Sequence, residues 1–436
     1  MLQFELKVVN SLLMKFQDSE FFQFTSRFAD RVRKNKDLRN NTFLALVSTA
    51  TTAVVSMISA PILAYLLPRE EYGTIIYIGT ITGLVVAFSA PGVLNAISFS
   101  VARGFEGSLK QGTRYRLRVY FRNSLILLPV AGWYFYFEND TTVALLLIVA
   151  CLSLPWAVAF DTGEQYLVGR SDFKTMFWRR IIVSVLIALV GILIALIFPH
   201  ATGVYIGKTL ATAVLIYLIY RYLLRTTRNE KQDPEFWEKA KSFNIISILT
   251  SIGGFTDKLV LGKIGDLGIL GGFSLALASM TPFEIAGKSL IKVFYGRLST
   301  PRERKERHLY VIITVVGLIS GTVFLILTLP LLQQLVNLIF PKYPEIVYYL
   351  PLLIVTYLFH MASAIPSTYG LFHNFSLWSS YNTWRNASRI LVLAVTVFTF
   401  GVWGAIYARL CYAILDYGMF TFLLWKEAPS VPVFSS

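Results

Sequence analysis

Long apolar runs alternate with short polar segments over almost the whole chain. Each run has about the 20 residues that a helix needs to cross the hydrocarbon core of a bilayer. Twelve such runs lie near residues 42–67, 74–100, 119–137, 142–168, 178–198, 204–224, 242–263, 268–293, 309–338, 346–371, 383–400 and 402–424. The pattern therefore predicts an all-α polytopic membrane protein with about twelve transmembrane helices.

The composition agrees with this pattern and excludes several classes of protein. Hydrophobic residues make up 55% of the 436 positions and charged residues only 15%, against roughly 25% charged in soluble domains. With a mean hydropathy of +0.59, the apolar residues are too many for a soluble core, which excludes a soluble enzyme, a DNA-binding factor and a secreted disulfide scaffold. The two cysteines, Cys151 and Cys411, lie in separate apolar runs and indicate neither a disulfide nor a thiolate metal site.

The distribution of charge predicts how the chain crosses the membrane. The chain has 40 Lys and Arg residues against 25 Asp and Glu, a net charge of +15. The basic residues concentrate in alternate connections, at 103–118, 170–180, 225–241 and 297–307. The connections on the other side are short and acidic or neutral, at 69–71, 138–140, 199–200 and 266. Because basic loops tend to stay in the cytoplasm, we expect both termini to be cytoplasmic.

The basic segment 225–241 divides the apolar runs into two sets of six. The chain is therefore expected to contain an amphipathic cytoplasmic segment over 1–41, a first lobe over 42–224, a linker over 225–241, a second lobe over 242–424 and a cytoplasmic tail over 425–436. A partly disordered basic tail is an equal alternative for the N-terminal segment. The helix end and turn at 59–73 have a counterpart at 258–272, and repeated halves are a feature of transporters.

Two regions of the chain resemble a known family. The stretch Ala60-Pro-Ile-Leu-Ala-Tyr-Leu-Leu-Pro-Arg-Glu-Glu-Tyr-Gly-Thr74 resembles the first hairpin of the bacterial polysaccharide (Wzx-type) flippases. Asp257-Lys-Leu-Val-Leu-Gly262, followed by Gly271-Gly-Phe-Ser-Leu-Ala276, resembles the seventh-helix pattern of the same family. These O-antigen and exopolysaccharide flippases belong to the multidrug/oligosaccharidyl-lipid/polysaccharide exporter superfamily. The chain departs from the pattern at Gly271-Gly272, where the family more often has a bulkier residue before the glycine.

The resemblance implies a fold, a cargo and a location. Two six-helix lobes would form a V that opens alternately to each side of the bacterial inner membrane, with no enzymatic step. The cargo would be an oligosaccharide carried on a polyprenyl diphosphate, used to build O-antigen in lipopolysaccharide, capsule or exopolysaccharide. A polysaccharide polymerase, a chain-length regulator and membrane lipids would then be the partners, and nucleic acid would not.

Charged residues inside the predicted spans are candidates for function, because an ionised group facing lipid costs free energy. The basic ones predict a cationic cavity that binds substrate phosphates, and they are Arg122, Lys208, Lys258, Lys288, Lys292, Arg389 and Arg409. The acidic candidates for coupling transport to H⁺ or Na⁺ are Asp257, Asp161, Glu164 and Asp416.

Structural roles stay open for several of these charges. Those near the inner boundary can instead extend their charged ends to the headgroups, and they are Arg122, Lys292 and Arg385. Glu284 and Lys288, four positions apart, can form an ion pair along one helix. Asp257 can pair with a base on the facing lobe instead of binding an ion.

Three classes of function fit a membrane protein of this kind. A flippase for lipid-linked oligosaccharides accounts for the basic interior. A drug or cation antiporter of the same superfamily has the same fold but a more acidic cavity, whereas here the intramembrane bases outnumber the acids, Glu284 included, by seven to five. A membrane glycosyltransferase, polymerase or ligase would need a sizeable outer loop, and no predicted outer loop exceeds several residues. The four histidines lack metal-ligand spacing, so no cofactor is expected.

Overall fold

The computed structural model describes residues 36–281, 304–373 and 375–425. Within these ranges the chain is helical and contains no strand, which confirms the all-α class. Most of the expected N-terminal segment over 1–41, and the expected tail apart from Trp425, lie outside the described residues. The same holds for Glu284, Lys288 and Lys292.

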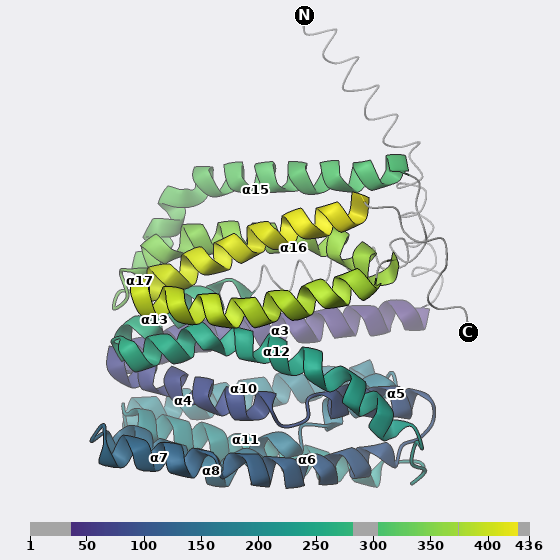
Figure 1. Ribbon diagram of the computed structural model, residues 1–436. Coiled ribbons are helices and arrows are strands. Elements are labelled where there is room, and N and C mark those ends of the chain that lie inside the picture. The colour runs from purple at the N-terminus through teal and green to yellow at the C-terminus, as the bar shows by residue number, and fades with distance from the viewer. Residues whose placement is uncertain (1–35, 282–303, 374, 426–436) are drawn as a thin grey trace, which may run out of the picture.

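The helices lie side by side and run roughly along one common direction (Figure 1). In the first half of the chain they are α3 (Lys36–Leu66), α4 (Arg69–Ala87), α5 (Gly92–Ala102), α6 (Ser108–Ser124), α7 (Leu127–Tyr136), α8 (Thr141–Ala159), α9 (Gly163–Gly169), α10 (Phe173–Ile197) and α11 (Ala201–Arg225). In the second half they are α12 (Phe236–Ile264), α13 (Leu267–Ser279), α15 (Arg304–Ile339), α16 (Ile346–His373) and α17 (Phe375–Trp425). Residues 236–241 of the expected linker thus belong to α12.

The two halves of the chain occupy opposite edges of the molecule. Helices α15, α16 and α17 form one edge, and α6, α7, α8 and α11 form the other (Figure 1). Helix α12 lies between them and packs on α17 on one side and on α4 and α5 on the other. Helix α13 packs on α4 and α16, so these two helices of the second half connect both edges.

The described helices agree closely with the predicted spans. Seven of them are long and apolar enough to cross a membrane, or eight if the bent pair α4 and α5 counts as one span. The remaining predicted spans correspond to α6 with α7, to α12 and to α13. Within the described residues these helices are too charged or too short to meet the same criterion of length and apolar composition. The protein is a multi-pass membrane protein, and the number of twelve crossings stays a prediction.

Helix α17 contains two of the predicted spans, because it folds back on itself at Gly401. Gly401 has φ +58° and ψ −136°, a conformation outside the helical range. Tyr412 Oη donates to Ser388 Oγ at 3.1 Å, and Arg385 Nη1 contacts Asp416 Oδ2 at 3.1 Å. These pairs are placed almost symmetrically about Gly401, as in an antiparallel hairpin (Figure 1).

The break between α4 and α5 bends the chain by 57°. Pro91 begins the second segment, and Ala90 before it has φ +55°, which is uncommon for a residue with a side chain. Two asparagines from other helices satisfy backbone groups released by the break. Asn123 Nδ2 donates to the Phe88 carbonyl oxygen at 3.2 Å, and Gly92 N–H donates to Asn244 Oδ1 at 2.8 Å.

The short acidic or neutral connections meet at one end of the molecule, which we call the short-turn end (residues 67–69, 137–140, 198–200, 265–266, 340–345 and 401). Here the two halves of the chain are in direct contact. Lys342 Nζ donates to the carbonyl oxygen of Leu67 at 3.0 Å, and Arg69 forms an ion pair with Glu345. A Cβ atom at Gly73 would lie 1.8 Å from the Leu267 carbonyl oxygen, so only glycine allows α4 this close to α13.

A further ion pair joins the halves at the short-turn end. Lys263 Nζ lies 2.5 Å from Glu138 Oε1. The hydrogen bond from Lys263 holds the pKa of the Glu138 carboxyl below its usual range. The pair is therefore present at neutral pH and is lost only when the pH falls through this lowered pKa.

The buried apolar residues form one large cluster that includes both halves of the chain. Leu67, Tyr77 and Leu146 of the first half belong to it together with Phe273 and Leu353 of the second.

We call the opposite end of the molecule the basic-loop end (residues 103–107, 170–172 and 226–235). Toward this end the buried apolar residues form two separate clusters. One contains residues of the first half with the start of α12, and another contains Tyr310, Tyr369 and Leu424. Among the described residues, the large apolar cluster thus joins the halves at the short-turn end, whereas at the basic-loop end only the start of α12 packs against the first half.

Candidate substrate cavity

A group of charged side chains lies between α12, α16 and α17, and we call it the second-half cluster (Asp257, Lys258, His360, Arg385, Arg389, Arg409 and Asp416). The Asp257 carboxylate at its centre has no exposed surface. Arg409 holds it with two donors, Nε at 2.6 Å and Nη2 at 2.5 Å from Oδ2. Such a two-pronged contact is specific to arginine, and it joins α12 to the last part of α17.

A second ion pair of this cluster joins the two arms of the α17 hairpin. Arg385 Nη1 contacts Asp416 Oδ2 at 3.1 Å, and Tyr381 Oη donates to Asp416 Oδ1 at 2.9 Å. Arg385 also donates from Nη2 to Asn386 Oδ1 at 2.9 Å. The side chain of Arg385 therefore points into the protein, which corrects the alternative that it only extends to the headgroups.

Positive charge is in excess in the second-half cluster. Arg389 makes no ion pair with a described residue, and its buried Nε has no hydrogen-bond partner. Its charge interacts with those of Arg409, Asp257, Arg385 and Asp416, and His360 of α16 lies within electrostatic range of the same arginines. Lys258, next to Asp257, adds a further charge. Among the described residues, four basic side chains thus face two carboxylates, an excess of two positive charges even with His360 neutral.

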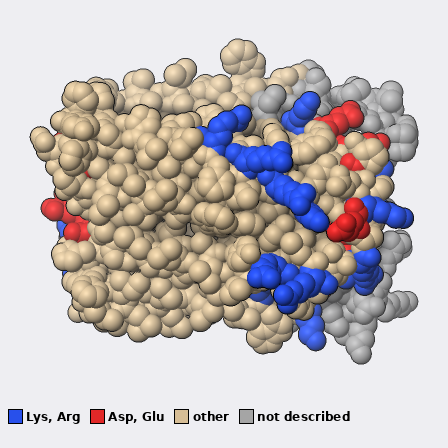
Figure 2. Space-filling view, turned by 90° about the horizontal axis from the view of Figure 1, so that it is seen from below, with Lys and Arg blue, Asp and Glu red and all other residues tan. Residues whose placement is uncertain are grey.

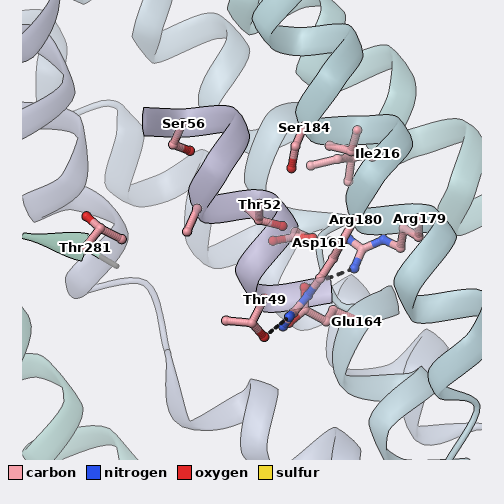
Figure 3. A pocket seen from close by; sticks show the side chains of 12 residues that line it. Thr49, Thr52, Ser56, Asp161, Glu164, Arg179, Arg180, Ser184, Ile216 and Thr281 are labelled. Carbon is pink, nitrogen blue, oxygen red and sulfur yellow. Dashed lines mark hydrogen bonds and ion pairs between the residues drawn. The ribbon is translucent and has the colours of Figure 1, made fainter. Parts of the chain in front are cut away.

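A pocket with different chemistry lies in the first half, and Figure 3 shows it from close by. We call it the hydroxyl pocket; its volume is about 400 Å³. Hydroxyl groups line it from α3, from α10 and from the residue that follows the C-cap of α13, and they belong to Thr49, Thr52, Ser56, Ser184 and Thr281. Since Thr281 belongs to the second half of the chain, both halves contribute to the wall.

Two arginines and two carboxylates form the charged part of the hydroxyl pocket. Arg179 pairs with Asp161 and lies 3.4 Å from Glu164. Arg180 pairs with Glu164, and its Nη1 donates to Thr49 Oγ1 at 2.7 Å. These four charges cancel one another formally, in contrast to the second-half cluster.

Of the sequence-predicted site residues, the structure brings together Lys258, Arg389 and Arg409 with Asp257 and Asp416. Asp161 and Glu164 lie in the other group, the hydroxyl pocket. Each of the four candidate ion-coupling carboxylates contacts an arginine. Their coupling role stays a prediction, and among the described residues no group of His, Cys, Asp and Glu has the arrangement of a metal site.

Two of the basic residues that the sequence predicts to bind substrate lie apart from both groups. Lys208 packs its alkyl chain against Gly191 of α10. Arg122 is exposed on α6, in line with Lys110, Arg114 and Arg118 at intervals of four residues. Figure 2, a view onto the face at the bottom of Figure 1, shows Lys and Arg gathered toward the basic-loop end next to a wide band without charge. The position of Arg122 agrees with the alternative that it extends toward the headgroups.

Sequence reasoning missed Arg179 and Arg180 as site residues. Both lie six or seven positions inside α10, where the basic connection passes into the apolar run, and were counted with the cytoplasmic loop. The signal that could have identified them is the matching pair of acids, Asp161 and Glu164, near the end of the preceding span.

Comparison with known proteins gives a family and a fold. The family described as polysaccharide biosynthesis protein matches residues 62–342. An inward-facing multidrug resistance MATE family transporter of the MOP superfamily is similar in structure, with a TM-score of 0.57, 13% identity and coverage of 88% of this chain and 98% of that one. An outward-facing structure of such a transporter gives a TM-score of 0.54 at 16% identity, covering 90% of this chain and 97% of the other.

A third similar structure is a MOP superfamily transporter from Pyrococcus furiosus, described as having a binding pocket of reverse polarity. It has a TM-score of 0.54 and 15% identity, and the match covers 90% of this chain and 97% of that one. No curated protein sequence matches the chain. The structural similarities show the fold, which is that of MATE-type transporters.

Proposed function

Because the chain belongs to the polysaccharide biosynthesis protein family and has the fold of MATE-type transporters, we propose that it is a flippase. Its cargo is an oligosaccharide repeat unit on polyprenyl diphosphate, moved across the bacterial inner membrane for the synthesis of O-antigen, capsule or exopolysaccharide. Both termini lie in the cytoplasm, and a polysaccharide polymerase with its chain-length regulator receives the cargo outside.

The excess of positive charge in the second-half cluster carries this proposal. A diphosphate is a compact anion, and Arg and Lys bind its oxygens by charge-assisted hydrogen bonds. Arg389 is the best placed of the group, since it makes no ion pair with a described carboxylate and has a buried Nε without a partner. An anionic cargo would complete its hydrogen bonding and offset the two surplus charges.

Transport follows from alternating closure of the two ends. The short-turn end is closed by contacts between the halves, so the diphosphate and sugars enter from the basic-loop end while the polyprenyl tail stays in lipid. Rocking of the first lobe (42–224) against the second (242–424) then closes the basic-loop end and opens the other. Asp257, Asp416, Asp161 and Glu164 remain candidates for coupling this change to H⁺ or Na⁺, because protonation would weaken their contacts with arginine.

A drug or cation antiporter of the same superfamily is the second candidate. The carboxylates of Asp161 and Glu164 favour it, since 46% and 27% of their side-chain surface stays exposed and they line a pocket. A cationic drug would, however, be repelled by the surplus charge of the second-half cluster. The two candidates thus predict opposite effects of reversing a charge there.

The test is the restoration of surface polysaccharide in a flippase-deficient strain. Replacing Arg389 by Ala removes a charge-assisted contact and should lower export about 10- to 100-fold. Arg389→Lys should restore export in part, because Lys keeps the charge but loses the two-pronged contact. Arg389→Glu should abolish export.

The matched control is Arg221→Ala, which removes an exposed arginine on α11 and should leave export unchanged. Membrane abundance of each variant is checked by immunoblot. Full export by Arg389→Glu at normal abundance would overturn the anionic cargo and favour the antiporter.

A further inference from the structure

We infer that the hydroxyl pocket is the subsite for the carbohydrate part of the cargo, separate from the second-half cluster that holds the diphosphate. This inference rests on the proposed function and adds to it two separate subsites. The first half of the chain binds the sugar, and the second half binds the diphosphate. The class of ligand is a neutral, polyhydroxylated sugar ring.

The charge of the pocket is the first argument. Arg179 and Arg180 are matched by Asp161 and Glu164, so the pocket offers no surplus charge to an anion or to a cation. A phosphate would have to displace a carboxylate from its arginine, whereas a sugar hydroxyl can bind beside the existing pairs. An uncharged polar ligand therefore fits the pocket better than either kind of ion.

The hydrogen-bonding groups are the second argument. Arg179 has a side chain only 6% exposed, and its Nε has no hydrogen-bond partner. The Asp161 carboxylate keeps 46% of its side-chain surface exposed although it is paired, so it has lone pairs left to accept. A sugar hydroxyl donates one hydrogen bond and accepts others, and it can use an arginine N–H and a carboxylate oxygen at the same time.

The hydroxyl groups add adaptable partners on the other walls. Ser56 of α3 and Ser184 of α10 both line the pocket. Neither hydroxyl makes a hydrogen bond with a described residue, unlike Thr52, whose Oγ1 donates to the Ser48 carbonyl oxygen at 3.0 Å. Serine hydroxyls can rotate to donate or accept as the ligand requires.

The size and position of the pocket are the last argument. A volume of about 400 Å³ lies within the roughly 300–1,000 Å³ of small-molecule sites. Thr281, two residues after the end of α13, brings the second half of the chain to the wall of a pocket that otherwise belongs to the first half. A sugar bound here would contact both halves, so any movement between the halves would change its contacts.

The experiment compares the affinity of the purified protein for two lipids. One probe is bare undecaprenyl diphosphate, and the other is the lipid-linked oligosaccharide extracted from a flippase-deficient strain. Wild type should bind the oligosaccharide lipid more tightly. Replacing Ser56 and Ser184 by Ala should weaken that binding about 2- to 10-fold per hydroxyl and leave binding of the bare diphosphate unchanged.

Two further variants make the test specific. Ser184→Phe fills the pocket and should reduce the affinity for the oligosaccharide lipid to that for the bare diphosphate. Ser153→Ala removes a hydroxyl of α8 that lies outside the pocket and donates to the Val149 carbonyl oxygen at 2.7 Å. This control should bind both lipids as wild type does.

The outcomes separate the inference from the proposed function. If wild type binds both lipids equally, or if the pocket variants weaken both to the same extent, the carbohydrate subsite is wrong and the flippase proposal stands. If wild type binds neither lipid, the proposed function fails. Unchanged binding of the oligosaccharide lipid by Ser184→Phe would also overturn the subsite.

Discussion

Asp257 and Arg409 lie 152 positions apart in the chain and meet inside the second half of the molecule. Their side chains are 0% and 14% exposed, so neither charge is balanced by water. The removal of one partner from a buried ion pair leaves the other charge uncompensated, and this costs far more than the pair itself contributes. The same argument applies to Asp416 and Arg385, whose side chains are 5% and 17% exposed.

This pairing predicts the result of a double-mutant cycle. Asp257→Asn and Arg409→Gln should each destabilise the purified protein, by about 3–5 kcal/mol. The double variant should be at least about 1 kcal/mol more stable than the sum of the two single effects, because it leaves no charge unpaired. Thermal or chemical unfolding in detergent provides the measurement, and strictly additive effects would contradict the pairing.

The sequence could predict the depth of these charges but not their partners. The position of Asp257 well inside an apolar run already indicated a group that must be paired or functional. Which base it meets depends on how α12 packs on α17, and no local pattern encodes that contact. For the same reason Arg385, near a span boundary, could not be distinguished from a side chain that reaches the headgroups.

At the scale of the secondary-structure elements, the single residue Gly401 determines that α17 folds into a hairpin. Its φ of +58° and ψ of −136° form a combination that glycine alone adopts readily, and a residue with a side chain there costs roughly 1–3 kcal/mol. The sequence placed a boundary between spans at this residue, because the apolar runs near 383–400 and 402–424 are separated there by a glycine. The tightness of the turn followed only from the structure.

Substitutions at two glycines of α17 should therefore have opposite effects. A Cβ would meet no atom within 4 Å at Gly401 or at Gly418, so crowding is the same at both sites. Gly401→Ala should lower the stability by about 1–3 kcal/mol, whereas Gly418→Ala, inside the helix, should raise it by about 0.5–1 kcal/mol. Unfolding of both variants in one detergent provides the comparison, and equal shifts would refute the role of Gly401.

At the scale of the whole molecule, contacts between the halves close the short-turn end. Arg69 pairs with Glu345, and the Arg69 guanidinium lies 5.0 Å from the centre of the Tyr343 ring. The alternation of basic and short connections predicted which turns lie together. It could not predict the conformational state, because the same sequence must form both the closed and the open arrangement during transport.

A reversible cross-link tests this closure. In a background with Cys151 and Cys411 replaced by Ser, cysteines at Arg69 and Glu345 should react with a bifunctional methanethiosulfonate and stop export until a reducing agent is added. Cysteines at Glu71 and His200 are the matched control. Those two residues also lie at the short-turn end, 3.5 Å apart, but both belong to the first half. Normal export by the cross-linked 69–345 protein would show that this contact need not open.

The most direct test of the proposed function uses purified protein in liposomes. The measurement is the rate at which lipid-linked oligosaccharide, extracted from a flippase-deficient strain, becomes accessible to a glycosidase that cannot cross the membrane. Wild type should accelerate this movement well above protein-free liposomes, and Arg389→Glu should not. Failure of wild type to accelerate it, combined with ion-driven movement of a cationic dye by the same preparation, would contradict the flippase and establish the antiporter.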